Sequence, residues 1–126
     1  MPLDWIKNFV HRDPDQDIEG MTFADLEETS HLSCQNLDPI FSTDDPGLSR
    51  YKALSKKMIS WHGMADECIT VYGTRRYYDK VLAWDQNARS YYRHFEAPGL
   101  SHCSRGPGSY YPLRALYALV RWTEAG

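Results

Sequence analysis

The chain has 126 residues, of which 42% are apolar and 25% charged, with a formal net charge of -3 and a pI of about 5.9. This is ordinary globular composition, and the length fits one domain covering residues 1–126. The chain has no basic stripe and no run of roughly 20 apolar residues, which argues against a nucleic-acid partner and a membrane span.

Location and redox chemistry follow from the N-terminus and the cysteines. The first residues lack the basic and then apolar layout of a signal peptide. We therefore expect a cytoplasmic protein if the chain is a complete gene product, and a secreted one if it is a processed fragment of a longer protein. Cys34, Cys68 and Cys103 are an odd number in no zinc-like spacing, so we expect no metal and no cofactor. Cys34 and Cys68 are interpreted as buried thiols.

Two short helices are predicted near the N-terminus. Residues 3–10 have the spacing of an amphipathic helix, with three apolar side chains on its buried side: Trp5, Ile6 and Phe9. Residues 22–28 form the second helix, with Thr22 as N-cap and Asp25 in the capping-box position. Residues 30–50 are predicted to be rich in loops.

Strands and helices alternate in the second half of the chain. After a helical turn at 48–54, we predict strands at 57–62 and 89–96 and helices at 70–86 and 111–125. This βαβα order implies two parallel strands joined by a right-handed crossover. The fold class is therefore α/β. Because a two-stranded parallel sheet leaves edges and faces uncovered, we expect a homodimer or a partner chain to complete it.

Asp66 and His102 each follow a predicted strand by a short loop. The carboxyl ends of parallel strands share one edge of a sheet, where ligands bind in open α/β folds. A carboxylate on one imidazole nitrogen makes the other a competent base near neutral pH. Acid before His is the chain order of an α/β-hydrolase triad, but no Gly-x-Ser-x-Gly turn is present. The alternative is two loop residues that cap or are solvated.

The sequence around these two residues is informative. Residues 58–66 (MISWHGMAD), 95–103 (FEAPGLSHC) and 106–108 (GPG) resemble the C-terminal part of the tannase/feruloyl esterase family, and residues 44–49 (DDPGLS) also look like a segment of that family. Its members are secreted serine esterases with an α/β-hydrolase fold that cleave phenolic esters. The resemblance covers most of residues 40–125.

The resemblance implies that Asp66 is the triad acid and His102 the triad base. In the family, the Cys at the position of Cys103 pairs with a Cys before the nucleophilic Ser, and that half of the family's sequence has no counterpart here. The calcium site of the family's lid is also without counterpart. His62 matches a His of the family's His-Gly motif, which suggests a structural role, whereas His31 and His94 have no such context.

A replacement nucleophile is not expected within the chain. Ser60 lies in a strand, Ser101 and Ser104 flank His102, and none of the three sits on a strained elbow. Cys103 is not expected to serve as a thiol nucleophile either, because the ring of its neighbour His102 would point away from it along the loop.

The sequence therefore favours a truncated tannase-like enzyme that uses Asp66 and His102 for non-hydrolytic proton transfer. Cyclisation, dehydration or isomerisation of an aromatic or polyketide-type small molecule would fit, as in fungal secondary metabolism. Aromatic side chains are the candidate substrate-binding walls: Trp61, Tyr91, Tyr92, Tyr110 and Tyr111. Two alternatives stay open. The chain is one part of a split phenolic ester hydrolase with its Ser on a partner chain, or it is a non-catalytic ligand-binding or assembly protein.

Overall fold

The computed structural model describes residues 2–103 and 112–125. The chain forms two compact units, Met1–Thr43 and Asp44–Gly126, each of which is described by itself. A single domain over residues 1–126 stays a prediction. Within the described ranges, no helix combines the length and the apolar character that crossing a membrane requires.

The first unit is built from helices packed through aromatic rings. The short helix α1 (Pro2–Trp5) continues into a π-helix, η1 (Ile6–His11). The long helix α2 (Phe23–Phe41) follows. The Trp5 and Phe9 rings stack with centroids 4.8 Å apart, and the ring of Phe41 meets Trp5 edge-on at 5.8 Å. The Trp5 indole N–H donates to Ser33 Oγ at 3.0 Å. Trp5 and Phe9 thus lie on one packed side, but the predicted burial is incomplete: Trp5 and Ile6 are half-buried and Phe9 is 47% exposed.

Helix α2 begins at its predicted cap and runs further than predicted. Thr22 Oγ1 accepts the backbone N–H of Asp25 at 3.3 Å, and Asp25 Oδ2 accepts the N–H of Thr22 at 2.8 Å. The prediction of loop from residue 30 is wrong, because the helix continues to Phe41. No glycine interrupts it; Pro39, which lacks the N–H that would bond to the Gln35 carbonyl, lies in the last turn, and the helix ends two residues later.

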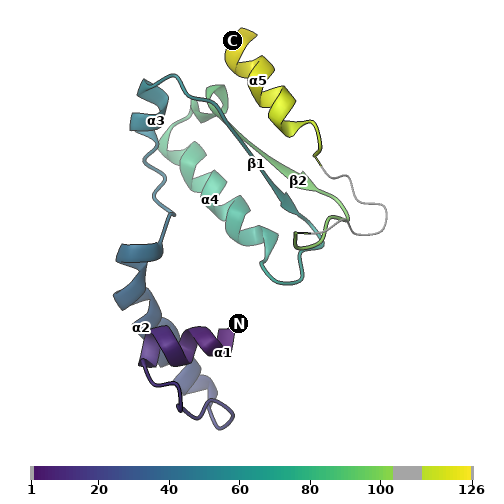
Figure 1. The fold of residues 1–126 in the computed structure, drawn as a ribbon. Coiled ribbons are helices and arrows are strands. Elements are labelled where there is room, and N and C mark those ends of the chain that lie inside the picture. The colour runs from purple at the N-terminus through teal and green to yellow at the C-terminus, as the bar shows by residue number, and fades with distance from the viewer. Residues whose placement is uncertain (1, 104–111, 126) are drawn as a thin grey trace. The chain divides into compact units, whose positions relative to one another are not determined.

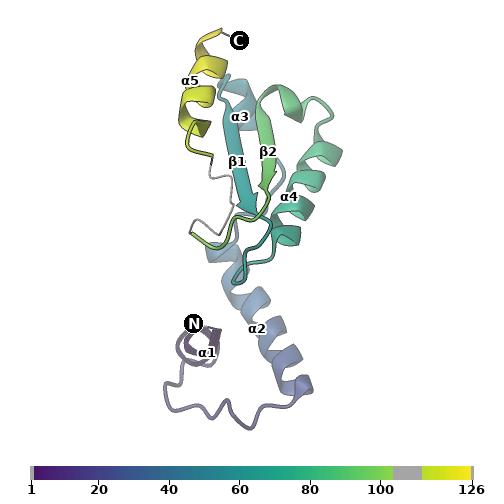
Figure 2. The same ribbon diagram turned by 90° about the vertical axis from the view of Figure 1, so that its right-hand side faces the viewer.

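The second unit contains the predicted βαβα order. After α3 (Ser49–Ala53) come strand β1 (Met58–Gly63), helix α4 (Val71–Trp84), strand β2 (Tyr92–Ala97) and helix α5 (Ala115–Ala125). The strands pair in parallel, from Met58 opposite Tyr92 to Gly63 opposite Ala97. Strand β2 starts three residues later than predicted because Ala88–Ser90 form a 3-10 turn, η2. Helices α4 and α5 lie on opposite faces of the sheet (Figures 1 and 2).

The α4 face of the sheet holds the core and a set of polar contacts. Val81 is fully buried among Ala88, Tyr91 and Tyr92, and the Tyr78 ring meets Tyr92 edge-on at 5.0 Å. At the end of β2, the Glu96 carboxylate takes two hydrogen bonds from the Arg75 guanidinium of α4, both of 2.6 Å. Such a two-bond pair fixes the first turns of α4 against β2.

The α5 face of the sheet is only partly covered. A cavity of about 340 Å³ lies there between sheet and helix, lined by side chains that include Ile59, Trp61, Phe95 and Trp122. The Arg93 guanidinium lies 4.0 Å from the centroid of the Trp122 ring, which ties α5 to β2 through a cation–π contact. Phe95 remains 53% exposed.

Candidate active site

The ends of β1 and β2 are tied together directly beyond the sheet. The N–H of Met64 donates to the Ala97 carbonyl at 2.9 Å, and that of Ala65 to the Leu100 carbonyl at 3.1 Å. Gly63 lies against Leu100 so closely that a Cβ on Gly63 would fall 2.8 Å from the Leu100 carbonyl carbon. The absence of a side chain at Gly63 therefore lets the loop carrying Asp66 pack on the loop carrying His102.

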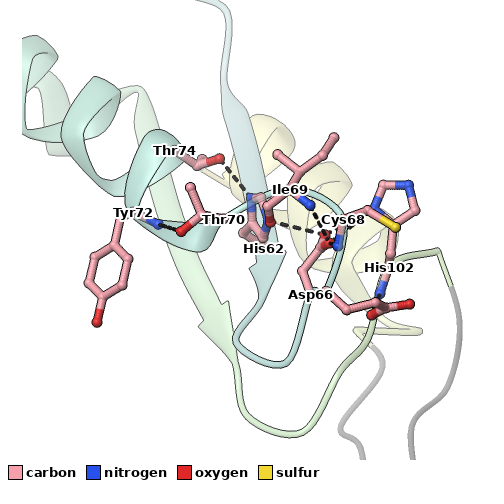
Figure 3. Close-up of polar contacts among 9 residues, drawn as sticks. His62, Asp66, Cys68, Ile69, Thr70, Tyr72, Thr74 and His102 are labelled. Atoms are coloured by element: carbon pink, nitrogen blue, oxygen red, sulfur yellow. Dashed lines mark hydrogen bonds and ion pairs between the residues drawn. The ribbon is translucent and has the colours of Figure 1, made fainter. Parts of the chain in front are cut away.

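Asp66 and His102 meet at this edge of the sheet. His102 Nδ1 lies 3.0 Å from Oδ2 and 3.2 Å from Oδ1 of Asp66 (Figure 3). The Asp66 side chain is 8% exposed and that of His102 32% exposed. The two residues singled out from the sequence thus lie in hydrogen-bond contact, and their catalytic roles stay predictions.

The Asp66 carboxylate is surrounded by donors. Oδ1 accepts the backbone N–H of Cys68 at 2.9 Å and that of Ile69 at 2.8 Å, while Oδ2 faces the imidazoles of His102 and His62 at 3.0 and 3.2 Å. The bond from Ile69 lowers the pKa of Asp66 to about 2, with His102 and Cys68 contributing, against burial that raises it. Asp66 is therefore ionised at every pH well above 2, including neutral pH.

The charge state of Asp66 fixes where the His102 proton lies. A carboxylate can only accept, so Nδ1 of His102 carries the hydrogen and Nε2 holds a lone pair when the ring is neutral. His102 lines a cavity of about 330 Å³ together with Trp61, Ile69 and Leu100. The His102 backbone is held by its own N–H, which donates to the Glu67 carboxylate at 3.3 Å. The arrangement presents a basic imidazole, oriented by a carboxylate, beside a cavity.

His62 belongs to the same cluster, which sequence reasoning did not foresee. Its Nδ1 lies 2.7 Å from Thr74 Oγ1 on α4, and its Nε2 lies 3.0 Å from the Ile69 carbonyl and 3.2 Å from Asp66 Oδ2 (Figure 3). The signal that could have found it is the spacing of four residues between His62 and Asp66 across a tight Gly turn.

The predicted aromatic walls are distributed differently from the expectation. Trp61 lines the cavity beside His102. Tyr91 and Tyr92 do not, because both are buried in the core cluster; the pleat directs Tyr92 towards α4, and Tyr91 precedes the strand. Neither side chain therefore forms a wall of the cavity beside His102. Tyr110 and Tyr111 lie outside the described residues, as does the candidate Ser104.

Hydroxyl groups near the pair are the remaining candidates for a nucleophile. Ser60 Oγ is engaged with the Tyr92 hydroxyl at 2.9 Å and with His94 Nδ1 at 3.0 Å, on the α4 face and away from His102. Ser101 lines the cavity next to His102. No serine within residues 2–103 and 112–125 shows a hydrogen bond to the His102 ring.

The cysteines differ from their expected environment. Cys34, Cys68 and Cys103 are all free and exposed, so the interpretation of Cys34 and Cys68 as buried thiols is wrong. Cys68 is exposed because it lies in the loop that carries Asp66, where residues 67–70 all face solvent.

Asp66, Cys68 and His102 offer one possible metal ligand each, within 4.8 Å of one another. A cation there would have to replace the proton that already joins Asp66 to His102.

The chain resembles known proteins over almost all of its length. The family model for tannase and feruloyl esterase matches residues 4–126. A probable feruloyl esterase of Arthroderma benhamiae is 36% identical over 126 residues, which are 97% of this chain and 24% of the relative. Feruloyl esterase C of Talaromyces stipitatus is 29% identical over 140 residues, covering 98% of this chain and 26% of the relative.

The fold of this chain matches one part of several larger solved structures. The tannin acyl hydrolase of Aspergillus niger superposes with a TM-score of 0.85 at 23% identity, over 98% of this chain and 25% of that chain. Feruloyl esterase B of Aspergillus oryzae gives a TM-score of 0.75 at 25% identity, over 98% and 27% respectively. The chain spans about a quarter of the length of these relatives and has part of their α/β-hydrolase fold. It belongs to the tannase and feruloyl esterase family.

Proposed function

We propose that this chain supplies the acid and the base of a serine carboxylic ester hydrolase that cleaves phenolic esters. Asp66 orients the imidazole and His102 transfers the proton. The nucleophilic serine comes from polypeptide outside these 126 residues, either in a longer protein or in a partner chain. The observation that carries the proposal is the bond between His102 Nδ1 and the Asp66 carboxylate, which leaves Nε2 basic beside the cavity.

Proton transfer follows the tautomer. Nε2 of His102 removes the proton of the serine hydroxyl as its oxygen attacks the ester carbonyl, and the resulting imidazolium is stabilised by Asp66. The imidazolium returns that proton to the alcohol oxygen that leaves. Water then attacks the acyl-serine with the same base, and the serine recovers its hydrogen while the carboxylic acid departs.

Family membership favours the ester hydrolase. The sequence alone favours non-hydrolytic proton transfer, with a split ester hydrolase as an alternative. Relatives named feruloyl esterases support the hydrolase, and no relative or fold neighbour described above supports cyclisation, dehydration or isomerisation. Pairing with a partner chain or with a second copy remains part of the proposal, since both outer edges of the β1–β2 sheet lack a strand among the described residues.

A chimera tests the proposed function. Residues 1–126 replace the matching quarter of the Arthroderma benhamiae relative, and hydrolysis of a hydroxycinnamate methyl ester is measured. We expect activity in the chimera and a loss of about 10³-fold or more in kcat on His102→Ala or Asp66→Asn. Gly73→Ala, in open space on α4, is the control that keeps activity. Equal rates for His102→Ala and the unmodified chimera would refute the role of His102.

Binding of the free hydroxycinnamic acid to the same chimera separates the non-catalytic alternative. In an ester hydrolase, His102→Ala leaves a folded protein that binds the acid and does not turn over the ester. If the unmodified chimera binds the acid but shows no hydrolysis that depends on Asp66 and His102, the binding-protein interpretation gains instead.

A further inference from the structure

We infer that His62 is a positioning residue for the Asp66–His102 pair, holding the plane of the Asp66 carboxylate so that it stays directed at His102 Nδ1. The inference rests on the proposed function for its meaning in catalysis. Its geometric content does not depend on hydrolysis. It assigns to the histidine before Gly63 a role beyond filling the end of β1.

The proton on His62 is fixed by its surroundings. Both atoms that face Nε2, the Ile69 carbonyl at 3.0 Å and Asp66 Oδ2 at 3.2 Å, can only accept. Nε2 therefore carries a hydrogen, which is shared between the two acceptors. Nδ1 of the neutral ring is then free to accept the hydroxyl proton of Thr74, whose Oγ1 lies at 2.7 Å.

The carboxylate needs this second hold. Its Oδ1 is anchored by the backbone N–H groups of Cys68 and Ile69, but one anchored oxygen leaves the carboxylate free to turn about it. Oδ2 is the oxygen closest to His102, at 3.0 Å, and His62 is the other imidazole that touches it. His62 thus anchors the oxygen that would otherwise move away from His102.

His62 is itself rigidly placed. It belongs to β1, and its side chain is only 12% exposed. Hydrogen bonds join its ring to Thr74 of α4 and to the Ile69 carbonyl in the loop that carries Asp66 (Figure 3). A ring held on two elements can transmit the position of α4 to Asp66. A ring that merely filled space would leave Oδ2 to His102 alone.

Two amide substitutions divide the contacts of His62. In His62→Asn the short side chain places its amide near the former Nδ1, so it reaches Thr74 but not Oδ2. In His62→Gln the longer side chain places its NH2 near the former Nε2, so it can still donate to Oδ2. The ring nitrogens of His102 are observed by two-bond ¹H–¹⁵N spectra of the 126-residue chain, together with water exchange of the Nδ1 proton.

We expect the Nδ1 proton of His102 to exchange at least about 10-fold faster in His62→Asn than in the unmodified chain, and within about 3-fold of it in His62→Gln. His31→Asn, at an exposed site in the other unit, is the matched control and should change nothing. Unchanged exchange in His62→Asn overturns the inference. Equal acceleration in both variants with a native backbone spectrum also overturns it, since His62 would then act through packing.

Should His62→Asn fail to fold, Thr74→Val decides. It keeps the shape of Thr74 and replaces the hydroxyl with a methyl group, so the His62 ring loses its hydrogen bond to α4. Faster exchange of the His102 proton in folded Thr74→Val supports the inference, and no change overturns it. Because none of these readouts needs an ester substrate, an inactive chimera with a His62-dependent His102 proton would refute the proposed function and leave this inference standing.

Discussion

Gly63→Ala is the substitution that most directly tests how the two site loops are held together. The added Cβ would lie 2.8 Å from the Leu100 carbonyl carbon and 3.2 Å from the Leu100 Cβ, with the carbonyl oxygen closer still. Ordinary carbon–carbon contact begins at about 3.5 Å, so the two loops must separate by at least roughly 0.7 Å to clear the carbonyl carbon, and further to clear the oxygen. The atoms in the way belong to backbone, which cannot turn aside as a flexible side chain can.

The cost can be worked from the contacts that separation disturbs. The bond from the Ala65 N–H to the Leu100 carbonyl is 3.1 Å long, and a retreat of that size takes it beyond hydrogen-bond distance. Overpacking costs about 1–3 kcal/mol and the lost bond about 1 kcal/mol, so unfolding should become easier by about 2–4 kcal/mol. In the chimera, displacement of Asp66 from His102 should lower kcat by about 10²-fold.

Urea unfolding of the 126-residue chain measures the free energy, and the chain supplies its own control. Gly73 lies in α4 with no atom within 4 Å of the place that an added Cβ would take, so Gly73→Ala should stabilise by about 0.5–1 kcal/mol. A Gly63→Ala protein within about 0.5 kcal/mol of the unmodified chain would refute the close-packing argument. So would a Gly63→Ala chimera that hydrolyses at the unmodified rate.

Three further predictions concern stability. The pKa of Asp66 is held at about 2, below its ordinary value of 3.8, so its carboxylate stabilises the fold fully above about pH 4. This contribution is lost as the pH falls towards about 2. Urea titrations should therefore show the stability difference between the unmodified chain and Asp66→Asn shrinking over that range. Val81→Ala, at a fully buried position, should cost about 2–3 kcal/mol in the same assay, and a loss under 0.5 kcal/mol would contradict its place in the core. Thr22→Ala should cost about 1 kcal/mol through the capping box and Thr22→Ser much less; equal losses would argue against the cap.

The meeting of Asp66 and His102 could be foreseen from the sequence. Two strand-like runs, each ended by a glycine-containing turn, place the following residues at one edge of a parallel sheet, and the register from Gly63 to Ala97 bears this out. The cap at Thr22 was equally legible, because a capping box is a local pattern whose two hydrogen bonds span three residues.

Other features depend on contacts that no local pattern encodes. Tyr91 and Tyr92 are adjacent, so in one extended strand they would point to opposite faces. In the structure Tyr91 instead lies before β2, just after the turn at Ala88–Ser90, and packing against α4 buries both side chains. The partners of His62 come from α4 and from the Asp66 loop, so its role emerges only once three elements are assembled. The length of α2 past residue 30 also lacked a signal, since its polar residues suit loops and helix surfaces alike.

The parallel pairing of β1 with β2 has a consequence for how the family can vary. The separation of acid and base in space is set by the strand register and by the contact of Gly63 with Leu100. Their separation along the chain is set by the crossover through α4, whose connections can lengthen or shorten without shifting either strand. We therefore expect two short motifs at a variable interval to identify members of the family better than a fixed count of residues between the acid and the histidine.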